Sequence, residues 1–240
     1  MKDNTERNYF GEFVDDYADE IMSIQPEFYK NAALKIDNTL LNIKAEKVLD
    51  IGNGGVINYS FQHLKELRCI DLEISPKAQE KYSSFSNVHF TQGNIFDMKD
   101  IPDNYYDAII IQTVIHHLAG DTAKESESNV IEALENCKRV LKSNGKVLVV
   151  ESVVKPWFDV IERMFYPLMQ FFFRVVKFDK VYQFSKKRLL ELLESYWKID
   201  EFDDVGVDKY IWLLRKKVLT KITPCRAAWY LLSLKEERKI

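Results

Sequence analysis

The stretch Val48-Leu-Asp-Ile-Gly-Asn-Gly-Gly55 joins a short apolar run to a glycine-rich turn. The apolar run predicts a buried strand, and the glycines allow the backbone to come close to a ligand where side chains would clash. Gly52 and Gly54 do not complete the G-x-G-x-x-G fingerprint of dinucleotide-binding proteins, because Ile57 stands where the third glycine belongs. The stretch therefore favours a ligand-binding turn but disfavours a nicotinamide oxidoreductase. Taken alone, such a turn is equally compatible with a purely structural role.

Short β-branched runs alternate with helical patterns on both sides of this turn. The alternation is typical of βαβ units and predicts an α/β fold with a Rossmann-like, doubly wound, mainly parallel sheet. The expected strands are residues 47–51, 68–73, 88–90, 107–112 and 146–151, and the expected helices between them are 58–67, one opening at Ser75-Pro76, and 128–142.

The flanking regions are expected to be mostly helical. Residues 9–41 predict one or two helices, residues 157–176 a very apolar helix kinked at Pro167, and residues 185–195 a helix capped by Ser185. Two strands, 198–202 and 210–214, are expected around an acidic turn, followed by an amphipathic helix over 227–237. The apolar content of helix 157–176 predicts that more than one of its faces is covered.

Charge is distributed unevenly along the chain. The net charge of −3 divides into −9 for residues 1–154 (16 Lys/Arg, 25 Asp/Glu) and +6 for residues 155–240 (18 Lys/Arg, 12 Asp/Glu). The acidic core gives no reason to expect nucleic-acid binding. The basic C-terminal third indicates either an anionic contact, such as a phosphate, a glycan acid or a lipid surface, or simply a solvated face.

The three cysteines, Cys69, Cys137 and Cys225, lie far apart and form no CxxC motif. They predict buried free thiols in a reducing compartment, with no metal site. Residues 1–8 do not resemble a secretory signal, and the most apolar stretch is too short and too polar to span a membrane. We therefore expect a cytoplasmic protein.

Two carboxylates, Asp71 and Glu73, fall on the same side of the second strand, near its C-terminal end. An acidic residue at this position can accept hydrogen bonds from both ribose hydroxyls of an adenosine group. We expect one of the two to bind a ligand and the other to solvate the end of the strand.

The ordered motifs resemble the class I S-adenosylmethionine-dependent methyltransferases, in particular the broad ubiquinone/menaquinone-methylase-like group. Residues 48–54 resemble the first motif of that family, V-L-D-x-G-x-G, and Glu73-Ile-Ser-Pro76 resembles its acidic residue followed by Ile/Leu-Ser-Pro, which favours Glu73 over Asp71. The resemblance extends over roughly residues 9–217 through four further segments: 92–97, 107–118 (DAIIIQTVIHHL), 138–146 and 184–193. The chain departs from the family pattern at Val56, where glycine is common, and at Asn94, where aspartate is common.

The resemblance implies a single methyltransferase domain over residues 1–240, with seven strands, a closing β-hairpin and a helical cap. Its expected parts are an N-terminal helical segment (1–41), a cofactor-binding core (42–153), a helical aromatic insertion or lid (154–184), a late helix with the closing hairpin (185–217) and a helical tail (218–240). The implied cofactor is S-adenosyl-L-methionine, with S-adenosyl-L-homocysteine as product. The implied cofactor-binding residues are Tyr17, Asp50, Gly52, Asn53, Gly54, Asp71, Glu73, Asn94, Ile95 and Gln112.

Methyl transfer is an in-line displacement that depends mainly on orientation, and a base helps only where the acceptor must lose a proton. His116 and His117 follow the fourth strand, where cofactor and acceptor should meet, and His116 is the preferred candidate. Glu151, at the end of the fifth strand, is a further catalytic candidate on the acceptor side. For the histidines, a packing role is the alternative.

The aromatic insertion carries the information on the acceptor. Its many aromatic residues are interrupted by Arg163, Arg174 and Lys177. This pattern is compatible with a hydrophobic or lipid-linked small-molecule acceptor and peripheral membrane contact, with a helical cap, or with a homodimer face. Glycan and phosphate-bearing acceptors also remain open. The alternative function is a non-catalytic nucleotide-binding scaffold or regulatory subunit that keeps the methyltransferase fold.

Overall fold

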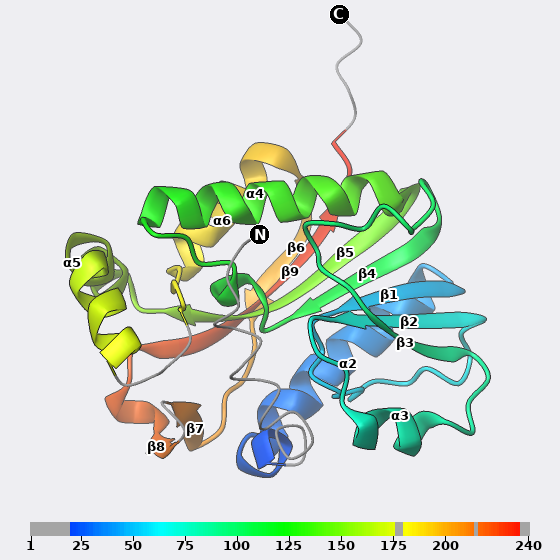
Figure 1. The fold of residues 1–240 in the computed structure, drawn as a ribbon, viewed down its shortest axis with the longest axis horizontal. Helices are drawn as coiled ribbons and strands as arrows, with labels where there is room; N and C mark the ends of the chain where they lie inside the picture. The colour runs from blue at the N-terminus through cyan, green and yellow to red at the C-terminus, as the bar shows by residue number, and fades with distance from the viewer. Residues whose placement is uncertain (1–19, 176–179, 214–215, 236–240) are drawn as a thin grey trace, which may run out of the picture.

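A computed structural model describes residues 20–175, 180–213 and 216–235 of the chain. Its centre is a seven-stranded sheet with the order β3-β2-β1-β4-β5-β9-β6 (Figure 1). The first five strands in this order are parallel to one another, and β9 is antiparallel to both of its neighbours. The strands are β1 (Lys47–Ile51), β2 (Glu66–Asp71), β3 (Val88–Gln92), β4 (Tyr106–Gln112), β5 (Leu141–Val154), β6 (Lys198–Asp204) and β9 (Cys225–Ser233).

The central strands are buried on both faces, which explains their continuous apolar sequences. Along β4, Ala108 and Ile110 join the core on one face of the sheet, and Ile109 and Ile111 join the core on the other. In register, Ile51 pairs with Ile70 of β2 and with Ile111 of β4. The carboxyl ends of β1, β2 and β4 therefore meet at one edge of the sheet, which confirms the predicted Rossmann-like fold.

Helices cover both faces of the sheet (Figure 1). On one face lie α4 (Ala123–Val140) and α6 (Lys186–Tyr196), and on the other lie α2 (Pro26–Asn42) and α3 (Pro76–Tyr82). The helix α5 (Pro156–Val175) stands at one end of the sheet, beyond the start of α4. In the described parts of the chain, no helix is long and apolar enough to cross a bilayer.

The segment expected to be a helix over residues 58–67 is instead a loop that leads into β2, so that prediction is wrong. Phe61 and Leu64 are buried as their spacing suggested, but from a loop. The side chain of Asn87 donates to both of their carbonyls, at 3.1 and 3.0 Å, and the amide of Ser60 donates to Asp37 at 2.7 Å. These side-chain partners satisfy the backbone without helical hydrogen bonds.

The prediction for the C-terminal region is also corrected. The strand that closes the sheet beside β6 is β9, whereas the strand expected over 210–214 is β7 (Tyr210–Leu213), which pairs with β8 (Lys216–Leu219) in a separate two-stranded sheet. The helix expected over 227–237, and with it the helical tail, is wrong because residues 225–233 are the strand β9. This strand lies between β5 and β6, so consecutive residues from Ala227 to Tyr230 are all buried.

The remaining helices agree with the sequence, with shifted ends. The helix α4 begins at Ala123 rather than at residue 128, because Thr122 caps it by accepting the amide of Glu125 at 3.0 Å. The helix α5 is kinked, with its non-helical residue at Phe165, just before Pro167. The expectation that its apolar faces are covered is wrong for the described residues, since large apolar side chains of α5 are exposed.

Candidate functional site

The glycine-rich turn after β1 is fastened to the end of β2. The amide of Gly52 donates to the carbonyl of Ile70 at 2.8 Å, and the amide of Gly54 donates to the Asp71 carboxylate at 2.9 Å. Asn53 closes the turn internally by accepting the amide of Gly55 at 2.9 Å. The turn therefore bridges the carboxyl ends of two parallel strands, the edge at which doubly wound sheets bind ligands.

Three glycines in this turn have positive φ: 68° at Gly52, 57° at Gly54 and 80° at Gly55. A Cβ atom on Gly52 would lie 2.7 Å from Val114, and one on Gly55 would lie 2.9 Å from Ala78. These two glycines are thus required by packing as well as by conformation. Packing and conformation together account for Gly52 and Gly55, and conformation accounts for Gly54, so the motif has a structural role at all three positions.

Asp50 is a buried carboxylate directly before the turn, with 1% of its surface exposed. Its Oδ2 accepts hydrogen bonds from the Tyr59 hydroxyl at 2.7 Å and from the Asn53 amide at 3.1 Å. Its Oδ1 has no partner among the described residues. Burial raises the pKa of Asp50 to about 7. A buried acceptor with an unused oxygen and an unfavourable charge fits a cationic ligand at this turn.

Asp71 and Glu73 have different surroundings. The Asp71 carboxylate accepts backbone amides from Gly54, Leu72 and Glu73, while burial raises its pKa. Glu73 lies beyond the end of β2 and is half-buried. The Asp71 carboxylate therefore holds the turn, and Glu73 stays the acid that the sequence predicts to bind a ligand.

Three further candidates follow β3 and β4. Asn94 uses its side-chain oxygen to accept the amide of Phe96 at 2.9 Å, and Ile95 is buried beside it. Gln112 ends β4 with 7% of its surface exposed, and its Oε1 has no partner among the described residues. All three side chains belong to the same sheet edge as the glycine-rich turn.

Glu151 supports the loop after β4 rather than facing solvent. Its Oε2 accepts the amide of Ile115 at 2.6 Å, and its Oε1 accepts the amide of Ser152 at 2.6 Å and contacts Nδ1 of His116 at 2.7 Å. With 1% of its surface exposed, Glu151 is committed to these partners. A carboxylate on Nδ1 orients an imidazole and leaves Nε2 to accept a proton, as in activated histidine bases.

The ring of His117 lies beside that of His116, with the centroids 4.1 Å apart and the planes tilted by 40°. Burial, together with the neighbouring imidazole, lowers the pKa of His117 well below its ordinary value. A half-buried histidine that stays neutral suits a packing role, whereas His116 has the Glu151 carboxylate on its Nδ1, so the geometry favours His116 over His117 as a base.

Tyr17 lies outside the described residues, and no cluster of three metal-binding side chains occurs within the described ranges. Sequence reasoning missed Tyr59, the partner of Asp50, because residues 58–67 were interpreted as a helix. It also missed Thr113, a non-glycine residue with φ of 56° directly after β4. Such a conformation is strained, and strained residues cluster at functional sites.

Comparison with known proteins agrees with this geometry. Residues 49–149 match the family described as methyltransferase domain. Cephaeline 6'-O-methyltransferase from Carapichea ipecacuanha is 28% identical over 107 residues, which are 43% of this chain and 27% of that enzyme. The chain matches 27% or less of the length of the curated relatives found.

Two solved structures share the fold over nearly the whole chain. The N-methyltransferase NodS from Bradyrhizobium japonicum WM9, in complex with S-adenosyl-L-homocysteine, has a TM-score of 0.61 at 13% identity, covering 98% of this chain and 100% of NodS. The second is the 1,6-didemethyltoxoflavin-N1-methyltransferase from Burkholderia thailandensis, with bound 1,6-didemethyltoxoflavin and S-adenosylhomocysteine. It has a TM-score of 0.61 at 13% identity, covering 97% of this chain and 88% of that enzyme.

The fold is that of the class I S-adenosylmethionine-dependent methyltransferases. More particularly, residues 49–149, from β1 into β5, match a methyltransferase domain family, and the resemblance to the class I S-adenosylmethionine-dependent methyltransferases is confirmed.

Proposed function

We propose that this protein is an S-adenosylmethionine-dependent methyltransferase that acts on a small-molecule acceptor. The observation that carries the proposal is the unpartnered, buried Oδ1 of Asp50 beside the glycine-rich turn. S-adenosylmethionine is a cation at neutral pH, and the site places three carboxylates, those of Asp50, Asp71 and Glu73, at adjoining strand ends. Electrostatic attraction therefore favours this cofactor over an anionic dinucleotide.

The residues that would hold the cofactor come from successive strand ends. The backbone of the turn at Gly54 gives close approach, Glu73 accepts the ribose hydroxyls, and Asn94 with Ile95 flanks the adenine. Gln112 supplies a polar group with an unused oxygen next to the turn. The bound cofactor would supply a methyl group activated by positive sulfur. The residues of the chain align the acceptor with that group and exclude water.

For a hydroxyl acceptor, the oxygen must lose its proton as the new carbon–oxygen bond forms. We assign this proton to Nε2 of His116, with Nδ1–H donating to Glu151. Glu151 is then a positioning residue, because its oxygens are occupied by the loop it holds. An amine acceptor that is already neutral would not need this base.

The proposal extends to acceptor and location. The acceptor is a small molecule with a hydroxyl, amine or carbon nucleophile, and the aromatic insertion favours one that is hydrophobic, lipid-linked or phosphate-bearing. The free thiols of Cys69, Cys137 and Cys225 support a reducing setting such as the cytoplasm.

Titration calorimetry with S-adenosylmethionine, followed by a methyl-donor consumption assay on pooled acceptors, tests the proposal. Binding should be lost or weakened in Glu73→Gln and retained in Glu80→Gln, which alters an exposed acid on α3. Binding without turnover on any acceptor would favour the non-catalytic scaffold. Absence of binding in the unmodified protein would refute the proposal.

A further inference from the structure

The helix α5 has an inverted distribution of side chains. Its inward face carries polar residues that bond to the core: Asp159 accepts the Ser185 amide at 3.2 Å and Glu162 accepts the Gln183 amide at 3.1 Å. The Tyr166 hydroxyl donates to the carbonyl of Gly120 at 2.9 Å. Surface helices of globular proteins normally turn apolar residues inward and polar residues outward.

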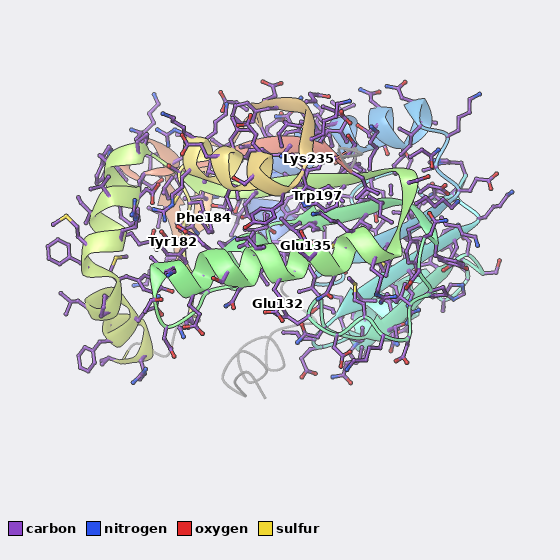
Figure 2. The ribbon with its side chains drawn as sticks, turned by 90° about the horizontal axis from the view of Figure 1, so that it is seen from above. Glu132, Glu135, Tyr182, Phe184, Trp197 and Lys235 are labelled. Atoms are coloured by element: carbon purple, nitrogen blue, oxygen red, sulfur yellow. The ribbon has the colours of Figure 1, made fainter. Side chains whose placement is uncertain are left out.

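The outward face of α5 is apolar and exposed. Its side chains expose 69% of their surface at Met164, 64% at Val175, 63% at Leu168, 62% at Phe171 and 55% at Trp157. Figure 2 shows α5 at one end of the molecule, with Tyr182 and Phe184 on the side that faces the other helices. Contiguous apolar surface of this kind marks an interaction site.

The charged side chains of α5 follow the same inverted distribution, with the acids buried and the arginines exposed. Its two acids, Asp159 and Glu162, are 5% and 1% exposed, whereas Arg163 and Arg174 are exposed. Lys155 precedes the helix, and like the arginines it is positive. The surface that α5 offers is therefore apolar with a cationic rim and no exposed acid on the helix.

A groove of about 820 Å³ continues this surface toward the start of α4. Val160 and Met164 give it an apolar wall, and Arg163 and Lys124 give it positive charge. Glu127, which also lines the groove, is paired with Arg188. An apolar wall beside uncompensated cations suits the boundary between acyl chains and anionic headgroups.

We propose that α5 is a membrane-surface helix, which lies in the headgroup region of an anionic bilayer with its apolar face inserted. The charge pattern selects lipid over a second copy of the chain, because a self-contact through α5 would bring arginines of both copies together without an exposed acid on either helix. Binding to lipid does not depend on methyl transfer.

The docked helix contacts the loop that carries the candidate base. Tyr166 bonds to Gly120 of that loop, and the amide of Tyr182, just beyond α5, donates to the carbonyl of His116 at 2.9 Å. In combination with the proposed methyl transfer, on which this step rests, membrane docking places the acceptor side of the site next to the bilayer. The matching acceptor is a molecule that partitions into lipid.

Co-sedimentation of the full chain with large vesicles tests the proposal. We expect at least about tenfold stronger binding to vesicles of phosphatidylcholine with about one-third phosphatidylglycerol than to phosphatidylcholine alone. Met164→Glu with Leu168→Glu should reduce binding to anionic vesicles at least about tenfold. Leu34→Glu with Leu41→Glu should not, although these side chains are 54% and 61% exposed, because they lie on α2 and not on α5.

A second variant, Arg163→Glu with Arg174→Glu, should remove the preference for anionic vesicles. Circular dichroism and light scattering establish that each variant is folded and report its oligomeric state. Equal binding to both vesicle types, or unchanged binding of the Met164/Leu168 variant, would overturn the proposal. The proposal would also be overturned if the unmodified protein were a dimer that binds no vesicles and that the Met164/Leu168 substitutions dissociate. Cofactor titration of the same variants separates this outcome from failure of the methyltransferase proposal.

Discussion

Replacing Asp50 with asparagine should stabilise the cofactor-free protein and weaken its binding of S-adenosylmethionine. Both hydrogen bonds to Asp50, from Tyr59 and Asn53, reach the same oxygen. The asparagine oxygen can take over that position, and its amide group replaces the oxygen that has no partner among the described residues. The substitution therefore removes a buried charge while keeping both contacts.

The magnitude follows from the raised pKa. Burial moves the pKa of Asp50 from 3.8 to about 7, so the folded protein holds this proton more tightly than the unfolded chain does. The stability that the protonated form contributes is fully present below about pH 4 and is lost as the pH rises through about 7. At about 1.4 kcal/mol per pKa unit, the loss above pH 7 is at most about 4 kcal/mol. We expect Asp50→Asn to recover about 2–4 kcal/mol at pH 8 and almost nothing at pH 4.

Urea unfolding followed by tryptophan fluorescence between pH 4 and pH 8 measures this difference. Asp100→Asn, at an exposed position, is the matched control and should change the free energy of unfolding by less than about 0.5 kcal/mol. In titration calorimetry, Asp50→Asn should weaken the binding of S-adenosylmethionine by about 1.5–3 kcal/mol. A variant less stable than the unmodified protein at pH 8, or equal in cofactor affinity, would refute the reasoning.

Three further substitutions test other parts of the account. Glu73→Gln should weaken binding of S-adenosylmethionine by about 1–3 kcal/mol in calorimetry without lowering Tm. Asp71→Ala should lower both the cofactor affinity and Tm, because the amide of Gly54 loses its acceptor, and equal effects of the two substitutions on Tm would contradict their separate roles. Glu151→Gln should reduce kcat on a hydroxyl acceptor about 100-fold while the cofactor Kd stays constant, because His116 loses its orienting partner; parallel losses in both would indicate a merely structural role. Burial raises the pKa of Glu162 from 4.5 to about 8, so its protonated form contributes stability that is lost as the pH rises between those values. Glu162→Gln should therefore raise stability at pH 9 by up to about 5 kcal/mol, and an unchanged pH dependence of Tm would contradict this.

The sequence predicted best where local pattern and tertiary environment agree. Strands such as β1 and β4 are buried on both faces, so their apolar runs stand out from the chain around them. The glycine-rich turn and the acids Asp71 and Glu73 follow strand ends, so topology alone places them at one edge. The sequence predicted that the acid not bound to a ligand would only solvate the strand end; that Asp71 instead holds the turn could not be predicted, because it depends on the hydrogen bond that the amide of Gly54 donates to Asp71.

The failures occurred where distant partners decide the structure. Residues 227–233 are apolar without a clear period, and only their pairing with β5 and β6 makes them a strand rather than a helix. The loop that contains Phe61 is fixed by Asp37 and Asn87, which are remote in sequence. The inverted side-chain distribution of α5 could not be predicted from the sequence either, because the burial of Asp159 and Glu162 depends on hydrogen bonds from the backbone amides of residues 185 and 183.

The crystal structure of the protein grown with S-adenosyl-L-homocysteine tests the central claim most directly. We predict density for the nucleoside at the carboxyl ends of β1 and β2, with its ribose hydroxyls on Glu73 and the backbone of residues 52–55 against the rest of the ligand. Density elsewhere, or this edge filled by side chains of the protein in the presence of saturating ligand, would contradict the account.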